Sequence, residues 1–372
     1  MCKNIHHNKT NPSFHGSDIE KIAAYFHIPM NSIANFGANV NPLGISEKVK
    51  SALADNLNVL STYPDRDYSS LRQVMGNYCQ VDPKHIMVGN GTSELIALLI
   101  EQSFPKKTLI LGPTYSEYER ELSFSTSTVE YYNLEPEGNF IFNLDDLVDK
   151  LSNNYDLLII CNPNNPTSTF IHNKVISEIL TACKKHNTFV MIDETYVEFV
   201  PDYENLSSMS LIDDFDNFMV LRGVSKFFAA PGIRLGYGVT SNAILLQNMK
   251  NAQIPWSLNS IGAYAGEIMF ADTSYIETTK TFIETEKRHI LSKLNNISGI
   301  HVYEPYANFI LVQIIKDNLT ANEVFVACLE KGLLIRDCSS FQNLHGEFFR
   351  FCIMDSESNS RLLHALKDIF TE

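Results

Sequence analysis

Lys226 is the residue in this sequence whose type and surroundings point most directly to covalent chemistry. With Ser225 it follows the short apolar run 219–221, and Arg234 comes shortly after it. A lysine in a desolvated pocket can lose its proton and attack an aldehyde carbon, whereas a solvated lysine carries no such chemistry. An arginine suits bidentate phosphate binding. The segment therefore indicates either an ordinary surface or a site for a phosphorylated carbonyl compound.

Asp193 stands at the end of another apolar run, 189–192. A buried carboxylate is costly unless a cation faces it. In a structural role, this carboxylate would cap a helix or form a salt bridge. In a binding site, it would pair with a protonated heterocyclic nitrogen. The residue type and position alone leave both interpretations open.

Two turn-rich segments supply further polar groups. Residues 89–93 read Gly-Asn-Gly-Thr-Ser before a helical pattern, and a glycine-rich turn that opens a helix presents free N–H groups to a phosphate. Residues 162–167 form an asparagine–proline turn, in which Pro166 would fix the Asn165 amide toward a ligand oxygen. The structural alternatives are an ordinary capped turn and a rigid loop.

Five short apolar runs must position these residues. Each run leads into a turn-rich segment and then a helical pattern, and runs that are nearly all apolar are typical of buried parallel strands. This alternation predicts an α/β sheet, in which ligands bind beyond the carboxyl ends of the strands. We therefore expect the polar residues at those ends to share one site. The runs are 86–88, 109–111, 157–161, 189–192 and 219–221.

The chain on either side of these runs has a different pattern. Apolar spacing predicts amphipathic helices at 17–26 and 46–57, with Ser46 as the N-cap of the second. After about residue 270 the pattern becomes that of an α+β module. The elements expected there are helices at 273–294, 321–331 and 358–370, and strands at 309–314, 333–336 and 348–353.

Neither terminal piece looks self-sufficient, so we expect the C-terminal module to be built together with part of the first 60 residues. The expected organisation has three parts. Residues 1–60 form an N-terminal arm and part of the small domain, residues 61–270 form the large domain, and residues 271–372 form the rest of the small domain.

Composition excludes several classes of protein. The 372 residues are 44% hydrophobic and 19% charged, which rules out intrinsic disorder. A net charge of −14 disfavours nucleic acid as a partner. No apolar run approaches the ~20 residues of a membrane-spanning helix, and residues 1–12 lack an apolar signal core. The seven scattered cysteines, without a CxxC pair, predict a cytoplasmic location and no metal site.

Five motifs, taken in order, resemble those of one known family. They are GNGTSE, PTYSEY, NPNNPT, DETYVEF and SKFFAAPGIRLGY. The set resembles the fold type I pyridoxal-phosphate enzymes of the class I/II aminotransferase superfamily and covers most of the chain. The resemblance implies pyridoxal 5′-phosphate as cofactor. It also implies an α/β fold, aminotransferase fold type I, with a mostly parallel, seven-stranded-type sheet in the large domain and a smaller α+β domain.

The resemblance also implies roles for single residues, of which Lys226, Asp193 and Tyr196 are the catalytic ones. Lys226 would hold the cofactor covalently, and Asp193 would pair with its pyridinium nitrogen. An anionic Asp193 favours the protonated ring that an electron sink requires. The other implied cofactor contacts are stacking by Tyr115, the phenolic oxygen held by Tyr196 and Asn165, and the phosphate held by Gly91, Thr92, Ser93, Ser225 and Arg234.

For the substrate, the resemblance implies a small phosphorylated amino acid or amine. Arg350 would bind the α-carboxylate, and Arg336 with Asn39 and His15 would hold a second anion. Two arginines suit a substrate that carries both a carboxylate and a phosphate. Tyr63 would reach the cofactor phosphate of a neighbouring subunit, which implies a homodimer with shared active sites.

The sequence departs from the family pattern at three positions. Ser168 follows NPNNPT where the family usually has a glycine, so the loop is expected to differ. Gly223 stands three residues before the lysine, where the family often has a serine or threonine that supplies a phosphate hydroxyl. Gly37 stands in FGANVNPLG where the decarboxylases of the superfamily typically have a serine. These departures bear on the identity of the substrate more than on the identity of the cofactor.

Two enzyme functions remain open at this point. Within the superfamily the chain is similar to histidinol-phosphate aminotransferases, and more similar to the L-threonine O-3-phosphate decarboxylases of cobalamin biosynthesis. The second similarity depends on His15-Gly16, FGANVNPLG, YPDRDY and QIPWSLNSIGAYAGE, the last of which contains the single tryptophan, Trp256. We therefore expect decarboxylation, with amino transfer to 2-oxoglutarate as the alternative. A DNA-binding regulator with a pyridoxal-phosphate effector domain is disfavoured by the acidic balance.

Overall fold

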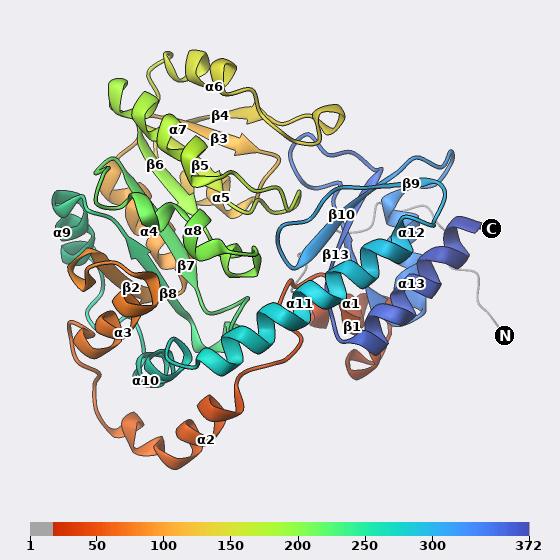
Figure 1. Ribbon diagram of the computed structural model, residues 1–372, viewed down its shortest axis with the longest axis horizontal. Helices are drawn as coiled ribbons and strands as arrows, with labels where there is room; N and C mark the ends of the chain where they lie inside the picture. Colours follow the sequence, from red (N-terminus) through yellow and green to blue (C-terminus); the bar gives the residue numbers. More distant parts are fainter. Residues whose placement is uncertain (1–17, 372) are drawn as a thin grey trace.

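A computed structural model describes residues 18–371 and places a seven-stranded sheet at the centre of the large part of the chain (Figure 1). The strand order is β2-β8-β7-β6-β5-β3-β4. Only β8 runs antiparallel to its neighbours. The predicted mostly parallel sheet is therefore confirmed. The five apolar runs form β2 (Ile86–Asn90), β3 (Lys107–Gly112), β5 (Leu157–Cys161), β6 (Phe189–Asp193) and β7 (Phe218–Gly223).

Two strands of this sheet were not located from the apolar runs. β4 (Thr128–Asn133) lies at the sheet edge, and its half-buried residues give no continuous apolar run. β8 (Leu235–Val239) is fully buried but contains Gly236 and Gly238, and glycine is depleted in strands. A Cβ at Gly236 would lie 2.4 Å from the backbone of Gly91, so the missing side chain lets β8 pass close to the glycine-rich turn.

Successive residues of the central strands face two different hydrophobic cores, because side chains alternate along a strand. In β6, Val190 and Ile192 belong to one core and Met191 to the other. The first core packs against helices α3 (Ser69–Cys79), α6 (Leu144–Leu151), α7 (Asn173–Lys185) and α10 (Ser260–Met269). The second core packs against helices α4 (Thr92–Ser103), α5 (Glu117–Leu122) and α9 (Ala243–Ala252).

The C-terminal part contains a four-stranded antiparallel sheet in the order β12-β13-β10-β9, beside which α12 and α13 lie (Figure 1). The long helix α11 runs toward it from the region of α10. The three expected helices and two of the three expected strands are confirmed. The elements are α11 (Thr273–Leu294), β9 (Ile300–Val302), β10 (Phe309–Ile314), α12 (Ala321–Glu330), β12 (Arg336–Asp337), β13 (Phe348–Cys352) and α13 (Ser356–Thr371).

The prediction of a single strand at 333–336 is wrong. The chain changes partners at Ile335, so that β11 (Leu333–Leu334) pairs with β1 (Ala34–Asn35) while β12 pairs with β13. The β1–β11 pair also joins the N-terminal segment to the C-terminal module. An apolar run does not show which strand it pairs with, so the change of partner at Ile335 was not predicted. The domain boundaries at residues 60 and 270 remain a prediction.

The two N-terminal helices form as expected, as α1 (Ile19–Phe26) and α2 (Glu47–Asp55). Ser46 occupies the N-cap position of α2, but its hydroxyl donates to the Asp272 carboxylate, at 2.5 Å, instead of accepting from the helix. The predicted N-cap position of Ser46 is therefore confirmed, although its side chain does not cap the helix. Within residues 18–371, no helix combines the length and apolar character needed to cross a membrane.

A buried ion pair ties the ends of two neighbouring central strands together. Arg222 of β7 donates from Nη2 to Glu194 Oε2, which follows β6, at 2.7 Å, and both side chains are almost inaccessible to solvent. Ser207 and the backbone of Ser208 donate to the same carboxylate. A buried pair with satisfied hydrogen bonds is tolerated, but an isolated buried charge is not.

We predict that Arg222→Met destabilises the protein by about 3–5 kcal/mol, because it leaves the Glu194 charge buried without its cationic partner. Urea unfolding followed by circular dichroism measures this change. The control is Lys184→Met, which removes an exposed pair with Asp216 and should cost at most about 1 kcal/mol. Equal effects of the two substitutions would contradict the role given to the buried pair.

Candidate active site

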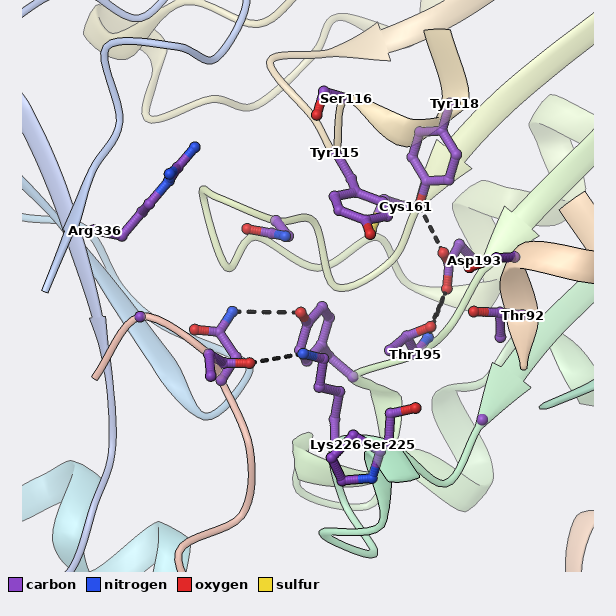
Figure 2. Close-up of a pocket in the computed structure, with 18 of the residues that line it drawn as sticks. Thr92, Tyr115, Ser116, Tyr118, Cys161, Asp193, Thr195, Ser225, Lys226 and Arg336 are labelled. Atoms are coloured by element: carbon purple, nitrogen blue, oxygen red, sulfur yellow. Dashed lines mark hydrogen bonds between the residues drawn. The ribbon is translucent and has the colours of Figure 1, made fainter. Parts of the chain in front are cut away.

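One cavity lies beyond the carboxyl ends of the central parallel strands, bordered on its other side by the four-stranded sheet (Figure 2). Figure 2 shows Lys226 between Asp193 on one side and Arg336 on the other. The motifs that the sequence separates by more than a hundred residues therefore meet here, as the strand-end argument predicts. The predicted site residues that line the cavity are Asn39, Thr92, Ser93, Tyr115, Asn165, Asp193, Tyr196, Ser225, Lys226, Arg234, Arg336 and Arg350.

Asp193 is a buried carboxylate held by two hydroxyl donors. Asp193 is the last residue of β6. Because side chains alternate along a strand, it points to the same side of the sheet as Met191, which is the side covered by α4 and α5. Tyr118 donates to Oδ2 at 2.7 Å, and the Thr195 hydroxyl donates to Oδ1 at 2.5 Å (Figure 2). Burial raises the pKa of Asp193, and the Thr195 and Tyr118 hydrogen bonds oppose that increase. A cation in the cavity would favour the ionised form further.

Lys226 presents its amine to the same cavity. Desolvation, and next the nearby Arg350 charge, lower the pKa of the amine to about 8. The Nζ atom donates to the carbonyl oxygen of Ala38 at 2.7 Å. An amine with this pKa is neutral in a substantial fraction of molecules near pH 8, and the neutral form is the one that can act as a nucleophile.

The glycine-rich turn leads directly into the N-terminus of α4. Gly91 has a φ of +80°, and a Cβ there would lie 2.4 Å from Nη2 of Arg234. The absence of a side chain at Gly91 is therefore what allows the guanidinium to approach the turn. Thr92, Ser93 and Ser225 line the cavity beside it. Hydroxyls, a helix N-terminus and a guanidinium are together suited to a phosphate.

Two aromatic residues border the space between the amine and the carboxylate. Tyr115 contacts Tyr118 edge-on, with ring centroids 5.6 Å apart, and lines the cavity. Tyr196 is buried and packs edge-on against Phe309 at 4.9 Å. Its hydroxyl accepts a hydrogen bond from Nδ2 of Asn39 at 3.4 Å, and burial raises its pKa, so the phenol is neutral.

Arg336 and Arg350 are direct partners on the adjacent strands β12 and β13, so their side chains stand on the same face of the sheet. Arg350 donates to the side-chain oxygen of Asn165 and to the carbonyl oxygen of Gly37. Its Nε atom is buried without a partner among the described residues. Burial, opposed by Cys338, lowers the pKa of Arg336, and the neighbouring Arg350 lowers it further. Two adjacent guanidiniums with an unused donor fit an anionic ligand.

Several lining residues were missed. Tyr118 and Thr195 hold Asp193, and Phe341 lies under the Arg336 guanidinium at 5.6 Å. Tyr118 and Thr195 lie within the quoted motifs, one helical turn after Tyr115 and two residues after Asp193, so their spacing was an available signal. Phe341 lies in a loop with no pattern that marks it.

Two of the predicted site residues that the structure describes do not line this cavity. Gly91 lies beside it, under Arg234. Tyr63 lies outside it, 77% exposed, with its ring 4.7 Å from that of Trp256. His15 falls outside the described residues, so its place is not given by the structure.

The departures from the family pattern have visible structural consequences. Ser168 is fully buried and adopts a left-handed conformation, with φ of +59°, so the backbone turn that a glycine would allow is kept by a serine. Gly223 lies against Thr92, where a Cβ would approach Cγ2 at 3.3 Å. Gly37 lines the cavity and uses its carbonyl oxygen to hold Arg350.

The donor set can be compared with the groups of a phosphorylated pyridine aldehyde. A lysine amine faces the cavity, a buried carboxylate stands across from it, and the glycine-rich turn lies beside them. The space at Gly91, which a Cβ would fill, is occupied by the guanidinium of Arg234. The residues present therefore fit the cofactor that the motif resemblance implies.

Comparisons with known proteins agree with this arrangement. The family model described as "Aminotransferase class I and II" matches residues 31–366. A protein of Caldanaerobacter subterraneus, provisionally named threonine-phosphate decarboxylase, is 36% identical over 90% of this chain and 90% of its own length. The threonine-phosphate decarboxylase of Salmonella typhimurium is 31% identical, covering 96% of this chain and 97% of its own length.

A solved structure is similar over most of its length as well. The histidinol-phosphate aminotransferase of Clostridium acetobutylicum superposes with a TM-score of 0.84 at 32% identity, covering 90% of this chain and 98% of that one. The matched family model extends over all the strands of the structure, from β1 to β13. The chain belongs to the class I and II aminotransferase family.

Proposed function

We propose that this protein is a pyridoxal-phosphate-dependent lyase that decarboxylates L-threonine O-3-phosphate to 1-aminopropan-2-ol phosphate, a reaction of cobalamin biosynthesis. The observation that carries the proposal is the pair Arg336 and Arg350, which stand side by side across the cavity from Asp193. A substrate with a carboxylate and a phosphate provides one anion for each guanidinium. The names of the two relatives from Caldanaerobacter and Salmonella support the same substrate.

Lys226 is the residue that would bind the cofactor covalently. Pyridoxal 5′-phosphate, when bound, supplies an electron sink for the pair of electrons released at the substrate α-carbon. Lys226 has an amine whose pKa is lowered to about 8, so it can act as a nucleophile and also carry a proton. We assign to it the return of a proton to the α-carbon after carbon dioxide leaves.

Asp193 would pair with the ring nitrogen of the cofactor and favour its protonated form. The hydroxyls of Tyr118 and Thr195 fix both carboxylate oxygens, so the carboxylate is oriented before the ligand arrives. The turn at Gly91, with Thr92, Ser225 and Arg234, would hold the phosphate.

Arg350 and Arg336 would fix the substrate at its two ends. Arg350 donates hydrogen bonds to the side-chain oxygen of Asn165 and to the carbonyl oxygen of Gly37, so its position is set before substrate binds. The position of the two anions decides which bond at the α-carbon points toward the electron sink. We assign to Arg350 and Arg336 the orientation of the substrate that favours loss of carbon dioxide.

The alternative is amino transfer between a phosphorylated amine, such as histidinol phosphate, and 2-oxoglutarate. The similarity to the aminotransferase of Clostridium acetobutylicum favours it, and both reactions would use the same cofactor residues. In amino transfer, Lys226 would remove a proton from the α-carbon, and Arg336 and Arg350 would hold the carboxylates of 2-oxoglutarate.

The proposal includes a homodimer with shared active sites. Tyr63 is exposed next to Trp256, and exposed apolar residues lie in the same two segments of the chain. A tyrosine in this place is available to a second copy of the protein and not to its own cavity. In the segments next to Tyr63 and Trp256, the other exposed large apolar residues are Leu57 and Leu60, within the short helix Leu57–Ser61, and Ile254.

A cytoplasmic location is also part of the proposal. Its support is that the described cysteines carry free thiols, which persist in reducing compartments. They are Cys79, Cys161, Cys183, Cys328, Cys338 and Cys352.

Incubation of the purified holoenzyme with each candidate substrate tests the reaction. We expect carbon dioxide release from O-phosphothreonine without added 2-oxoglutarate, because decarboxylation needs no amino acceptor. The parallel incubation contains histidinol phosphate and 2-oxoglutarate. Glutamate formation there, with no carbon dioxide from O-phosphothreonine, would establish the alternative.

We predict that Arg350→Ala lowers kcat/KM for O-phosphothreonine by at least about 100-fold, because a buried, charge-assisted contact to the substrate is lost. Cofactor affinity, measured by absorbance titration, should change much less. Arg288→Ala, on an exposed helix surface, is the control. A loss of cofactor affinity as large as the loss of kcat/KM would argue against a substrate role for Arg350.

Mixed dimers test the shared active sites. We expect Lys226→Ala to abolish turnover and Tyr63→Ala to weaken it, each as a homodimer. Because a mixed dimer has one site with both changes and one with neither, refolding the two variants together should restore activity. The turnover of the mixture is compared with that of each variant alone. A mixture that is no more active than the Tyr63→Ala protein it contains would refute shared active sites.

A further inference from the structure

Ser168 combines two features that are unusual in one residue. It is fully buried, and it adopts a left-handed backbone conformation with φ of +59°. Residues with a Cβ rarely adopt this conformation, which favours glycine. The position immediately follows the turn 162–167, which carries Asn165 into the cavity. A serine in this place is therefore expected to contribute something that a glycine cannot.

The contribution visible in the structure is a hydrogen-bond acceptor. The hydroxyl oxygen of Ser168 accepts from the backbone N–H of Ala307 at 2.9 Å. The carbonyl oxygen of Ser168 accepts from the N–H of Tyr306 at 2.9 Å. A glycine would keep the second bond but leave the buried N–H of Ala307 without this acceptor, and an unpaired buried donor is unfavourable.

The segment 306–308 that Ser168 holds is connected to the arginine side of the cavity. The carbonyl oxygen of Asn308 accepts from the N–H of Ile353, just beyond the strand that carries Arg350. The Asn308 side chain donates to the carbonyl oxygen of Asn39, at 3.2 Å. Asn39 and Arg350 both line the cavity.

Two further contacts hold the ends of this connection. Lys287 of α11 donates to the carbonyl oxygen of Tyr306 at 3.2 Å, so the segment is fixed from its far side. Within the turn, the Asn164 side chain donates to the carbonyl oxygen of Pro113 and accepts from Thr114, which precedes Tyr115. The N–H of Ser168 donates to the Asn164 carbonyl oxygen at 2.7 Å.

We infer that Ser168 is a positioning residue that fixes the cofactor-side turn carrying Asn165 against the 306–308 segment and, through it, against Asn39 and Arg350. The inference rests on the proposed function and adds to it a group that sets the separation between the cofactor side and the substrate side of the cavity. Ser168 is not among the residues that line the cavity, so it would act only through the residues it holds.

The test compares Ser168→Ala, which removes the hydroxyl and keeps the Cβ, with Ser168→Gly, which removes both. We expect both variants to raise the substrate KM by roughly five- to tenfold, the effect of one hydrogen bond, with a smaller change in kcat. The affinity for pyridoxal phosphate and the visible spectrum of the holoenzyme should stay as in the unchanged protein. Ser241→Ala, which removes a hydroxyl that donates to a backbone carbonyl oxygen elsewhere, is the matched control.

A Ser168→Gly enzyme with unchanged or lower KM would overturn the inference, because the serine would then be only a tolerated replacement for glycine. Equal losses of cofactor affinity and substrate affinity would also overturn it, because the role would then be general stability of the fold.

Hydrogen–deuterium exchange separates this inference from the proposed function, since it requires no substrate. We expect the Ala307 amide to exchange at least about tenfold faster in both Ser168 variants, and not in Ser241→Ala, because the hydroxyl acceptor is lost. Unchanged exchange of that amide would refute the positioning role whichever substrate is used. If neither candidate substrate is turned over while the amide exchange responds, the proposed function fails and the link between the two sides of the cavity stands.

Discussion

The structure depends on the burial of a carboxylate and the desolvation of an amine on opposite sides of one cavity. Either charge alone would be unfavourable in that position, because burial disfavours an ion without a partner. Asp193 is stabilised by the hydroxyls of Tyr118 and Thr195, and Lys226 by the Ala38 carbonyl oxygen. A ligand that carries a cationic ring nitrogen and an aldehyde satisfies both groups together. The glycine-rich turn and the two arginines are arranged around this pair.

The fold achieves this arrangement through the alternation of residues in a parallel strand. At the end of β6, Asp193 turns toward α5 and the cavity, while Glu194 turns to the opposite side and pairs with Arg222. Two adjacent acidic residues can thus have different roles, one in ligand binding and one in holding β6 to β7. A change of one residue in register would exchange the two faces. The buried pair therefore helps to fix the register on which the position of Asp193 depends.

Much of the cofactor side could be predicted from the sequence, because its residues lie directly after apolar runs and parallel strand ends meet at one edge. Asp193, Asn165 and Lys226 meet in one cavity for that reason. The pairing of Arg336 with Arg350 was not predictable, because it depends on the register of two strands separated by a loop. The strand expected at 333–336 was wrong for a related reason, since sheet partners are chosen by tertiary packing. The hydrogen bond of the Ser46 hydroxyl was not predictable either, because its acceptor, Asp272, is distant in sequence.

The assignment of Lys226 is tested most directly by reducing the purified holoenzyme with borohydride and mapping the pyridoxyl label by mass spectrometry. Reduction makes the bond between the cofactor and its lysine permanent, so the modified residue can be identified after proteolysis. We predict that the label lies on the peptide containing Lys226 and on no other lysine. A label on a different lysine, or a holoenzyme with no labelled peptide, would contradict it.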